Sequence, residues 1–288
     1  TLAAGTVAAT DITGIDGKTA TAVDADLVTT ITGSLSEALA VVTAHGNSTV
    51  DMGNDDTAYT ISGTQTATGT VGNVTTIGND TTGTVTASIG SLSAADINTN
   101  LSTAATDAIT IETTSTTTTA TILNALDGKT SVNVDADAIT AITGALAAGA
   151  TMAGASGLTL KSDYTFGATN AATTTGLVGN VATIAADTAG VVTASINAGG
   201  SLTAAQINSN LSTGSSGDSL TVTLAAATVA ATDITGIDTK TATAVDADLV
   251  TTITGSLSEA LAVQTAHVAG TVDMGGDNTA YTVSGTNA

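Results

Sequence analysis

The feature that most constrains this chain is that it repeats itself. Residues 1–66 and 223–288 align without a gap at an offset of 222 residues, and 55 of the 66 positions are identical. An offset of 111 also relates parts of the chain, since Asp16, Lys18 and Val23 correspond to Asp127, Lys129 and Val134. Repeats of tens of residues are typical of proteins in which each unit buries its apolar face against its neighbours. The sequence therefore predicts two repeats of two sub-units each, 1–111 and 112–222, followed by a partial third repeat, 223–288.

Local patterns within each repeat predict short helices and short strands in alternation. "SLSEALAVV" from Ser34 has a capping box between Ser34 and Glu37 and apolar residues at helical spacing. Similar helix starts are expected at Ser93, Thr119 and Thr203. Strands are expected where β-branched residues alternate with other residues, in "TATAVDA", "LVTTITG", "AYTISGT", "TVTASI" and "AITIETT".

Short connections that return the chain to the same direction imply parallel strands stacked by successive turns. We therefore expect a mainly β fold with short helices, a parallel β-solenoid of the α/β type. The scarcity of aromatic residues, 1% of the chain, fits a thin core in which small side chains stack on one another. One valine in each expected strand row, Val23, Val85, Val134, Val192 and Val245, should lie in a common buried ladder.

Charge and composition exclude several classes of function. Four Lys and no Arg stand against 25 acidic residues, which gives a net charge of -21 and argues against nucleic-acid binding. The sequence contains no cysteine, so neither disulfides nor thiolate metal sites are available. No apolar run is long enough for a membrane helix. Because the first residue falls inside a repeat, we expect this chain to be a segment of a longer polypeptide.

One resemblance narrows the expected setting of the chain. "ILNALDGKTSVNVDADAITAITGAL" and the related stretch from Asp16 resemble the Thr- and Ala-rich repeats of giant cell-surface proteins of marine cyanobacteria. The resemblance covers nearly all of the chain, although the alternating unit lengths depart from it. It implies an extracellular or cell-surface protein that is very long and not enzymatic.

Repeated aspartates are the candidate metal ligands. "DAD" recurs in all three repeats, and "DMGNDD" from Asp51 recurs as "DMGGDN" from Asp273. Calcium prefers several hard oxygen ligands from flexible loops, and stacked turns could supply them. The alternative is that these aspartates cap turns in solvent, since neither an EF-hand nor a glycine-rich nonapeptide is present. The candidate calcium ligands are Asp24, Asp26, Asp51, Asp55, Asp135, Asp137, Asp246, Asp248, Asp273 and Asp277.

Other polar residues give weaker signals. His45 and His267 occupy the same repeat position and lack a second histidine at ligand spacing. Each of Lys18, Lys129 and Lys240 follows an aspartate by two residues, which favours a local ion pair over a nucleophilic amine. "GTVGNV" at Gly69 and "GLVGNV" at Gly176 lack the lysine of a phosphate-binding loop, so we interpret them as turns.

The sequence as a whole indicates a structural segment of an extracellular fibre, surface layer or adhesin stalk with no enzymatic activity. No cofactor is expected with certainty, and calcium is the only candidate. The expected partners are further repeats of the same long chain or other copies of it. The alternative is a ligand-binding surface for glycans, ice or calcium-dependent adhesion, with hydroxyls arrayed by Thr-x-Thr pairs such as Thr30 with Thr32.

Overall fold

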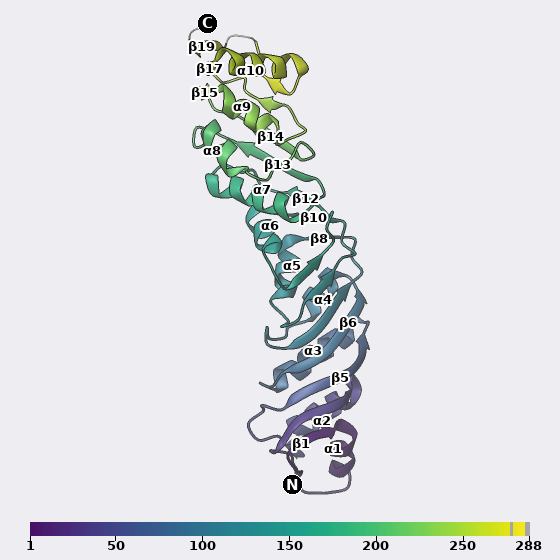
Figure 1. Cartoon of the computed structure of the whole chain (residues 1–288). Helices are drawn as coiled ribbons and strands as arrows, with labels where there is room; N and C mark the ends of the chain where they lie inside the picture. The colour runs from purple at the N-terminus through teal and green to yellow at the C-terminus, as the bar shows by residue number, and fades with distance from the viewer. Residues whose placement is uncertain (277–278, 286–288) are drawn as a thin grey trace. The chain divides into compact units, whose positions relative to one another are not determined.

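The chain folds into a mixed α/β structure in which strands and helices alternate along the sequence (Figure 1). The computed structural model describes residues 1–276 and 279–285, and this part of the chain contains ten helices. Two compact units are distinguished. The first comprises residues 1–118, 122–139 and 155–160, and the second comprises residues 119–121, 140–154 and 161–288.

The helices are short, and most of them directly follow a strand. They are α1 (Ala9–Asp16), α2 (Leu35–Gly46), α3 (Thr68–Asp80), α4 (Ala94–Asn100), α5 (Ala120–Asp127), α6 (Leu146–Ala153), α7 (Thr175–Asp187), α8 (Ala204–Asn210), α9 (Ala231–Asp238) and α10 (Leu257–Ala269).

Strands of the first unit pair in parallel and form one long sheet in the order β1-β3-β5-β6-β7-β9-β11, beside a short β2-β4 pair. The long strand β6 pairs with β5 on one side and with β7 on the other. The strands of this part of the chain are β1 (Gly5–Ala8), β2 (Val23–Asp24), β3 (Val28–Ser34), β4 (Val50–Asp51), β5 (Ala58–Gln65), β6 (Val85–Leu92), β7 (Ala108–Thr113), β8 (Thr117–Thr119), β9 (Val134–Ala136) and β11 (Leu158–Leu160).

The second unit repeats this arrangement with its own parallel strands. One sheet has the order β8-β10-β12-β13-β14-β16-β18, and a second sheet has the order β15-β17-β19. Strand β13 is equivalent to β6 in its pairing, because it pairs with β12 on one side and with β14 on the other. These strands are β10 (Ala141–Gly144), β12 (Thr165–Ala168), β13 (Val192–Asn197), β14 (Ser219–Thr223), β15 (Thr228–Ala230), β16 (Val245–Asp246), β17 (Thr252–Ser256), β18 (Val272–Asp273) and β19 (Ala280–Ser284).

The two near-identical ends of the sequence form the same elements in the same order. Helix α9 matches α1 residue for residue at the offset of 222, and the strand register Thr30↔Ala58 recurs as Thr252↔Ala280. This agreement confirms that the repeated sequence specifies a repeated local structure. The repeat boundaries at 111/112 and 222/223 mark the sequence period and do not coincide with the division into compact units.

The helix starts that the sequence predicts at capping residues are confirmed. The Ser34 hydroxyl accepts from the Glu37 amide at 3.4 Å, and the Ser34 amide donates to Glu37 Oε2 at 2.7 Å, so the capping box is complete. Ser93 and Thr203 cap α4 and α8 in the same way through their side-chain oxygens. By contrast, "TATAVDA" is strand only at Val23–Asp24, because the residues before it form a turn.

Five helices, α1, its copy α9, α3, α6 and α7, were not expected from the sequence, and the glycine-rich stretches interpreted as turns lie inside α3 and α7. Val71, Val74 and Ile77 recur every three residues and are fully buried on one face of α3. Gly69 and Gly72 have open space where a side chain would be. Packing of the apolar face thus outweighs the low helix propensity of glycine, which is about 1 kcal/mol per residue.

The core consists of rows of apolar side chains that continue from strand to strand. Ile31 lies beside Tyr59 in the strand register, Tyr59 lies beside Val85, and all three are almost completely buried. In the second unit, Ile142, Phe166 and Val192 form the corresponding row. Burial of each such side chain contributes about 1.5–3 kcal/mol.

The five valines expected in one buried ladder are all buried, but they do not stack directly on one another. Val23 pairs with Val50, and Val134 lies between Ile111 and Leu158. The five valines belong to three different sheets: Val23 lies in the β2-β4 pair, Val85 and Val134 lie in the long sheet of the first unit, and Val192 and Val245 lie in the long sheet of the second unit.

Val134→Asp tests the core, because Val134 is 0% exposed. An unpaired carboxylate at this position should lower the free energy of unfolding by about 3 kcal/mol or more. Val132→Asp is the matched control, since Val132 lies two residues away and is 37% exposed. Urea unfolding of both variants checks the register, and equal effects would contradict it.

Candidate functional site

The first aspartate of each "DAD" motif lies in the last two residues of a strand and stabilises the turn that follows. Asp24, Asp135 and Asp246 accept, through Oδ1, the backbone amides of the second aspartates at 3.4, 3.2 and 3.2 Å. An aspartate that accepts the amide two residues later stabilises a turn by itself. The first aspartate of each motif therefore has a structural partner within its own turn.

The second aspartates of the outer motifs face another carboxylate. Strand pairing places Asp24 beside Asp51 and Asp246 beside Asp273, which brings Asp26 close to Asp51 and Asp248 close to Asp273. Partial desolvation of its carboxyl group, together with the charges of Asp51 and Asp24, raises the pKa of Asp26. The same causes, with Asp273 and Asp246, raise the pKa of Asp248.

The middle motif lacks this pair of carboxylates. Asp135 lies beside Glu112 on one neighbouring strand and beside Thr159 on the other. Thr159 thus occupies the place that Asp51 and Asp273 occupy in the outer copies. The repeat therefore contains its own comparison for the effect of the second carboxylate.

The structure does not gather the nine described candidate calcium ligands at one site, although it brings Asp26 close to Asp51 and Asp248 close to Asp273. Asp55 contacts His45 and not the Asp26–Asp51 pair, and Asp277 lies outside the described residues. Within residues 1–276 and 279–285, no three His, Cys, Asp or Glu side chains come together in a group that could hold a metal ion. Calcium binding at the paired aspartates stays a prediction.

Asp26→Asn and Asp248→Asn test the carboxylate pairs through their pH dependence. A carboxyl group whose pKa is raised in the folded state makes folding less favourable as pH rises from its ordinary value, 3.8, through the raised value. Removing the charge should therefore raise the urea midpoint at pH 7 and leave it unchanged at about pH 3. Asp137→Asn removes the equivalent charge in the copy where Thr159 takes the place of the second carboxylate, and it should give no such gain.

Calcium at matched ionic strength extends this measurement. If the Asp26–Asp51 pair binds calcium, calcium should raise the midpoint of the parent chain more than magnesium does and should have less effect on Asp26→Asn. Equal responses to the two cations would assign these aspartates to turns alone.

A second polar group, at the ends of α2 and α3, was given no role from the sequence. His45 Nε2 lies 3.3 Å from Asp55 Oδ1, and His45 Nδ1 lies 3.2 Å from Asp80 Oδ1. The two carboxylates contact opposite edges of the imidazole ring, so they cannot share one metal ion with it. His45 bridges the loop after β4 and the last residue of α3. The equivalent His267 instead contacts the Val272 carbonyl at 3.1 Å.

Two tyrosine hydroxyls lie near the last residues of α3 and α7. The Tyr164 hydroxyl donates to Asp187 Oδ2 at 2.8 Å. Tyr59 is 1% exposed, and its hydroxyl has no hydrogen-bond partner among the described residues. Burial and the neighbouring carboxylates Asp80 and Asp55 raise the pKa of Tyr59 far above its ordinary range. Phe166 occupies the same register position as Tyr59, beside Ile142 in place of Ile31.

Tyr164→Phe and Tyr59→Phe should therefore have different effects on stability. Tyr164→Phe removes a hydrogen bond to a carboxylate and should lower the free energy of unfolding by about 1–2 kcal/mol. Tyr59→Phe removes a buried hydroxyl without a partner and should leave stability unchanged or increase it. Thermal or urea unfolding at pH 7 measures both. A larger loss for Tyr59→Phe than for Tyr164→Phe would contradict the assigned hydrogen bonds.

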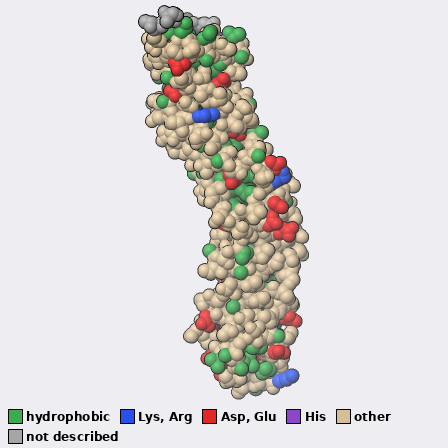
Figure 2. Space-filling model, viewed as in Figure 1, with side chains coloured by type: hydrophobic (Ala, Val, Ile, Leu, Met, Phe, Trp, Pro, Cys, Tyr) green, Lys and Arg blue, Asp and Glu red, His purple; other side chains and the backbone are tan. Residues whose placement is uncertain are grey.

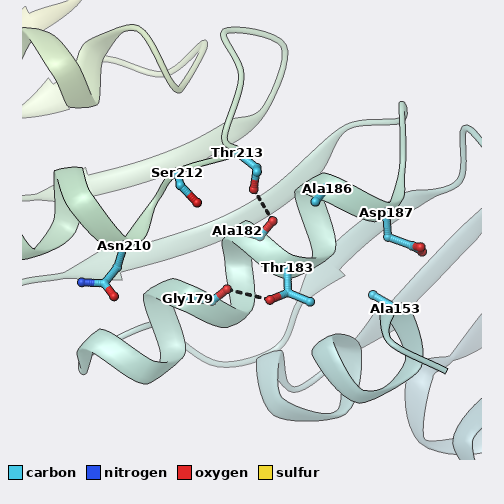
Figure 3. A pocket seen from close by; sticks show the side chains of 9 residues that line it. All are labelled: Ala153, Gly179, Ala182, Thr183, Ala186, Asp187, Asn210, Ser212 and Thr213. Carbon is cyan, nitrogen blue, oxygen red and sulfur yellow. Dashed lines mark hydrogen bonds between the residues drawn. The ribbon is translucent and has the colours of Figure 1, made fainter.

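A shallow hollow of about 500 Å³ lies in the second unit between α7 and the chain after α8 (Figure 3). Two of its hydroxyls are already used, since Thr183 donates to the Gly179 carbonyl at 3.0 Å and Thr213 donates to the Ala182 carbonyl. Its one carboxylate, Asp187, accepts from Tyr164. These contacts stabilise the packing of neighbouring segments.

The most regular polar contacts connect each turn of the chain with the one before it. Lys129 Nζ donates to the Asn98 carbonyl and to Asn98 Oδ1, the latter at 2.8 Å. Lys240 makes the same two contacts with Asn208, at 2.5 and 2.8 Å. Burial lowers the pKa of both lysines. The expected local ion pairs with Asp127 and Asp238 are therefore wrong, because each ammonium group reaches the preceding helix.

Buried aspartates and threonines complete these contacts. Asp107 accepts the amides of Val85 and Ala104 at 2.8 and 2.9 Å, and Asp218 accepts those of Val192 and Ser215 at 2.9 Å each. Buried Thr130 and Thr241 each accept an amide from the preceding strand and donate to a carbonyl of the same strand. The exact recurrence of these residues at an offset of 111 was the signal in the sequence that could have identified them.

Comparison with known proteins adds no family to these observations. No family model, curated protein or solved structure matches the chain. None of the helices in the described residues has both the length and the apolar character needed to cross a lipid bilayer.

Proposed function

We propose that the chain is a non-enzymatic structural segment of a parallel solenoid in an extracellular fibre, surface layer or adhesin stalk. The parallel pairing of strands from successive turns supports the solenoid. The resemblance to Thr- and Ala-rich repeats of giant cell-surface proteins supports the extracellular setting.

The observation that carries this proposal is the use of the repeated polar residues. Lys129, Lys240, Asp107 and Asp218 recur at an offset of 111 and make the same contacts with neighbouring turns in both copies. Residues at a catalytic centre would present polar groups to a substrate. These residues instead present theirs to the backbone of the adjacent turn, where they hold the stack together.

Acidic side chains lie in several separate places on the face shown in Figure 2 and do not form one large patch. Together with the net charge of -21, this dispersal favours solubility and discourages unspecific association between copies. A long surface protein without cysteine depends on such packing and charge for its stability.

Threonine rows favour a second candidate, a surface that binds glycans or ice. Thr32 lies beside Thr60 and Thr60 beside Thr86 on successive strands of the first unit, and Thr60 and Thr86 are exposed. The row ends at Ala108, which follows Thr86 in the register. A glycan array or an ice-growth assay with the parent chain and with Thr60→Val/Thr86→Val tests this candidate. A surface that binds through its threonine hydroxyls would lose activity in the variant.

Electron microscopy of the native material tests the proposed function. Immunogold labelling of intact source cells with antibodies against this chain should place the protein outside the cell. Negative staining of the isolated protein should show a thin filament, a stalk or a lattice. Label confined to the cell interior would contradict the extracellular setting, and compact isolated particles would contradict the structural role.

A further inference from the structure

The segment that follows α1 occurs three times in the chain with nearly the same sequence. It reads "DGKTAT" from Asp16, "DGKTSV" from Asp127 and "DTKTAT" from Asp238. Each copy directly follows an apolar residue, which is Ile15, Leu126 or Ile237. The three copies can therefore be compared position by position.

In the second and third copies, from Asp127 and from Asp238, this segment is covered by a preceding helix and strand. Leu126 and Ile237 are 0% exposed. Lys129 and Lys240 reach Asn98 of α4 and Asn208 of α8.

Backbone and hydroxyl groups of the second and third copies also contact the preceding strand or the residue just before it. The Ser131 and Ala242 amides each donate at 2.7 Å, to the carbonyls of Asp107 and Asp218. The hydroxyls of Thr130 and Thr241 donate to the carbonyls of Ile109 and Leu220.

In the first copy the same groups have no preceding helix or strand to meet. Ile15 is 42% exposed. Within the described residues, Lys18 Nζ and the Ala20 amide have no hydrogen-bond partner, and the Thr19 hydroxyl contacts Thr21 Oγ1 at 2.9 Å. Hydrophobic side chains also gather at this end of the chain in Figure 2.

A glycine inside the helix also has different surroundings in the first and third copies. A Cβ atom at Gly236 of α9 would lie 2.6 Å from Asn208 Oδ1, so any larger residue would require the Asn208 side chain to move. In α5 the equivalent residue is Ala125. Gly14, the equivalent residue of α1, has no atom within 4 Å of the same point. Glycine inside a helix costs about 0.5–1 kcal/mol relative to alanine, and at Gly14 nothing in the described structure compensates for this cost.

We propose that the surface formed by Ile15, Lys18, Thr19 and Ala20 is a docking surface for a helix and strand of the α8–β14 type from another repeat of the same kind. This proposal rests on the proposed solenoid and names the part of a neighbouring repeat that the surface accepts. The occupant carries an asparagine at the position of Asn98 and Asn208, whose carbonyl and side-chain oxygen accept from Lys18. Its strand begins with the equivalent of Asp107 or Asp218, whose carbonyl accepts the Ala20 amide.

The sequence position of the asparagine determines which helices fit. Asn98 and Asn208 are the fifth residues after the N-caps Ser93 and Thr203. In α2 and α10 the fifth residues after Ser34 and Ser256 are Leu39 and Leu261, which offer no side-chain acceptor to Lys18. The last helix of a second copy, α10, is therefore a poor match, and the surface selects a helix of the α4 or α8 type.

The experiment adds such an occupant to the full chain. A copy of residues 169–222 is joined ahead of Thr1, which recreates the chain's own junction because Thr1 corresponds to Thr223. Hydrogen exchange of the amides of residues 15–21, the Ala20 amide in particular, should slow at least tenfold relative to the parent chain. The thermal midpoint of the segment that contains α1 should rise.

Lys18→Ala and Lys161→Ala give the matched comparison. Lys161 is exposed and pairs with Asp163 within its own turn, so Lys161→Ala should affect the parent and the extended chain equally. Lys18→Ala should lower the midpoint of the extended chain while leaving the parent nearly unchanged. In the extended chain, replacing the asparagine that corresponds to Asn208 by alanine should have the same effect as Lys18→Ala.

Unchanged exchange at residues 15–21, an added segment that stays unprotected, or equal effects of Lys18→Ala in both chains would each overturn the proposal. These outcomes are independent of where the protein is found. Docking of the added segment together with an intracellular location would overturn the proposed function alone.

Discussion

Parallel pairing between neighbouring strands is the interaction on which the rest of this structure depends. In the second unit, five consecutive residue pairs join β13 and β14, from Thr193↔Ser219 to Asn197↔Thr223. Because each strand supplies the backbone partners of its neighbour, side chains at equivalent positions are brought next to one another. Rows such as Ile31, Tyr59 and Val85 follow directly from that register. Side chains at these positions must fit their neighbours on both sides, which explains why the core uses mainly Ala, Val, Ile and Leu.

The same register also brings like charges together. Strand pairing places Asp24 beside Asp51 in one copy and Asp246 beside Asp273 in another, and the chain has few cations to compensate for them. Several repeated aspartates avoid this conflict because backbone amides satisfy them, as Asp107 and Asp218 show. The Asp26–Asp51 and Asp248–Asp273 pairs instead bring two carboxylates together, and there the pKa of Asp26 and of Asp248 is raised.

Recurrent polar contacts between neighbouring segments help to hold together a chain that has few aromatic residues, no cysteine and, in its described part, no metal-binding cluster. Lys129 and Lys240 use a backbone carbonyl and an amide oxygen of the preceding helix instead of a carboxylate. Such contacts are directional and recognise a particular residue, so they determine which helix can precede which. In the solenoid that we propose, this polar recognition determines the order of the turns, whereas apolar burial supplies most of the stability.

The sequence by itself determined the period, the parallel arrangement, the capped helices at Ser34, Ser93 and Thr203, and the acidic, cysteine-free character of the chain. Each of these follows from local patterns or from the repetition of letters. Only the tertiary structure decided that the glycine-rich stretches at Gly69 and Gly176 are helical, since burial of Val71, Val74 and Ile77 outweighs local propensity. It also decided the partners of Lys129 and Lys240, and it separated Asp55 from the other candidate calcium ligands. These outcomes depend on which residues of one turn lie opposite those of the next, and that register is set by the lengths of the segments between strands.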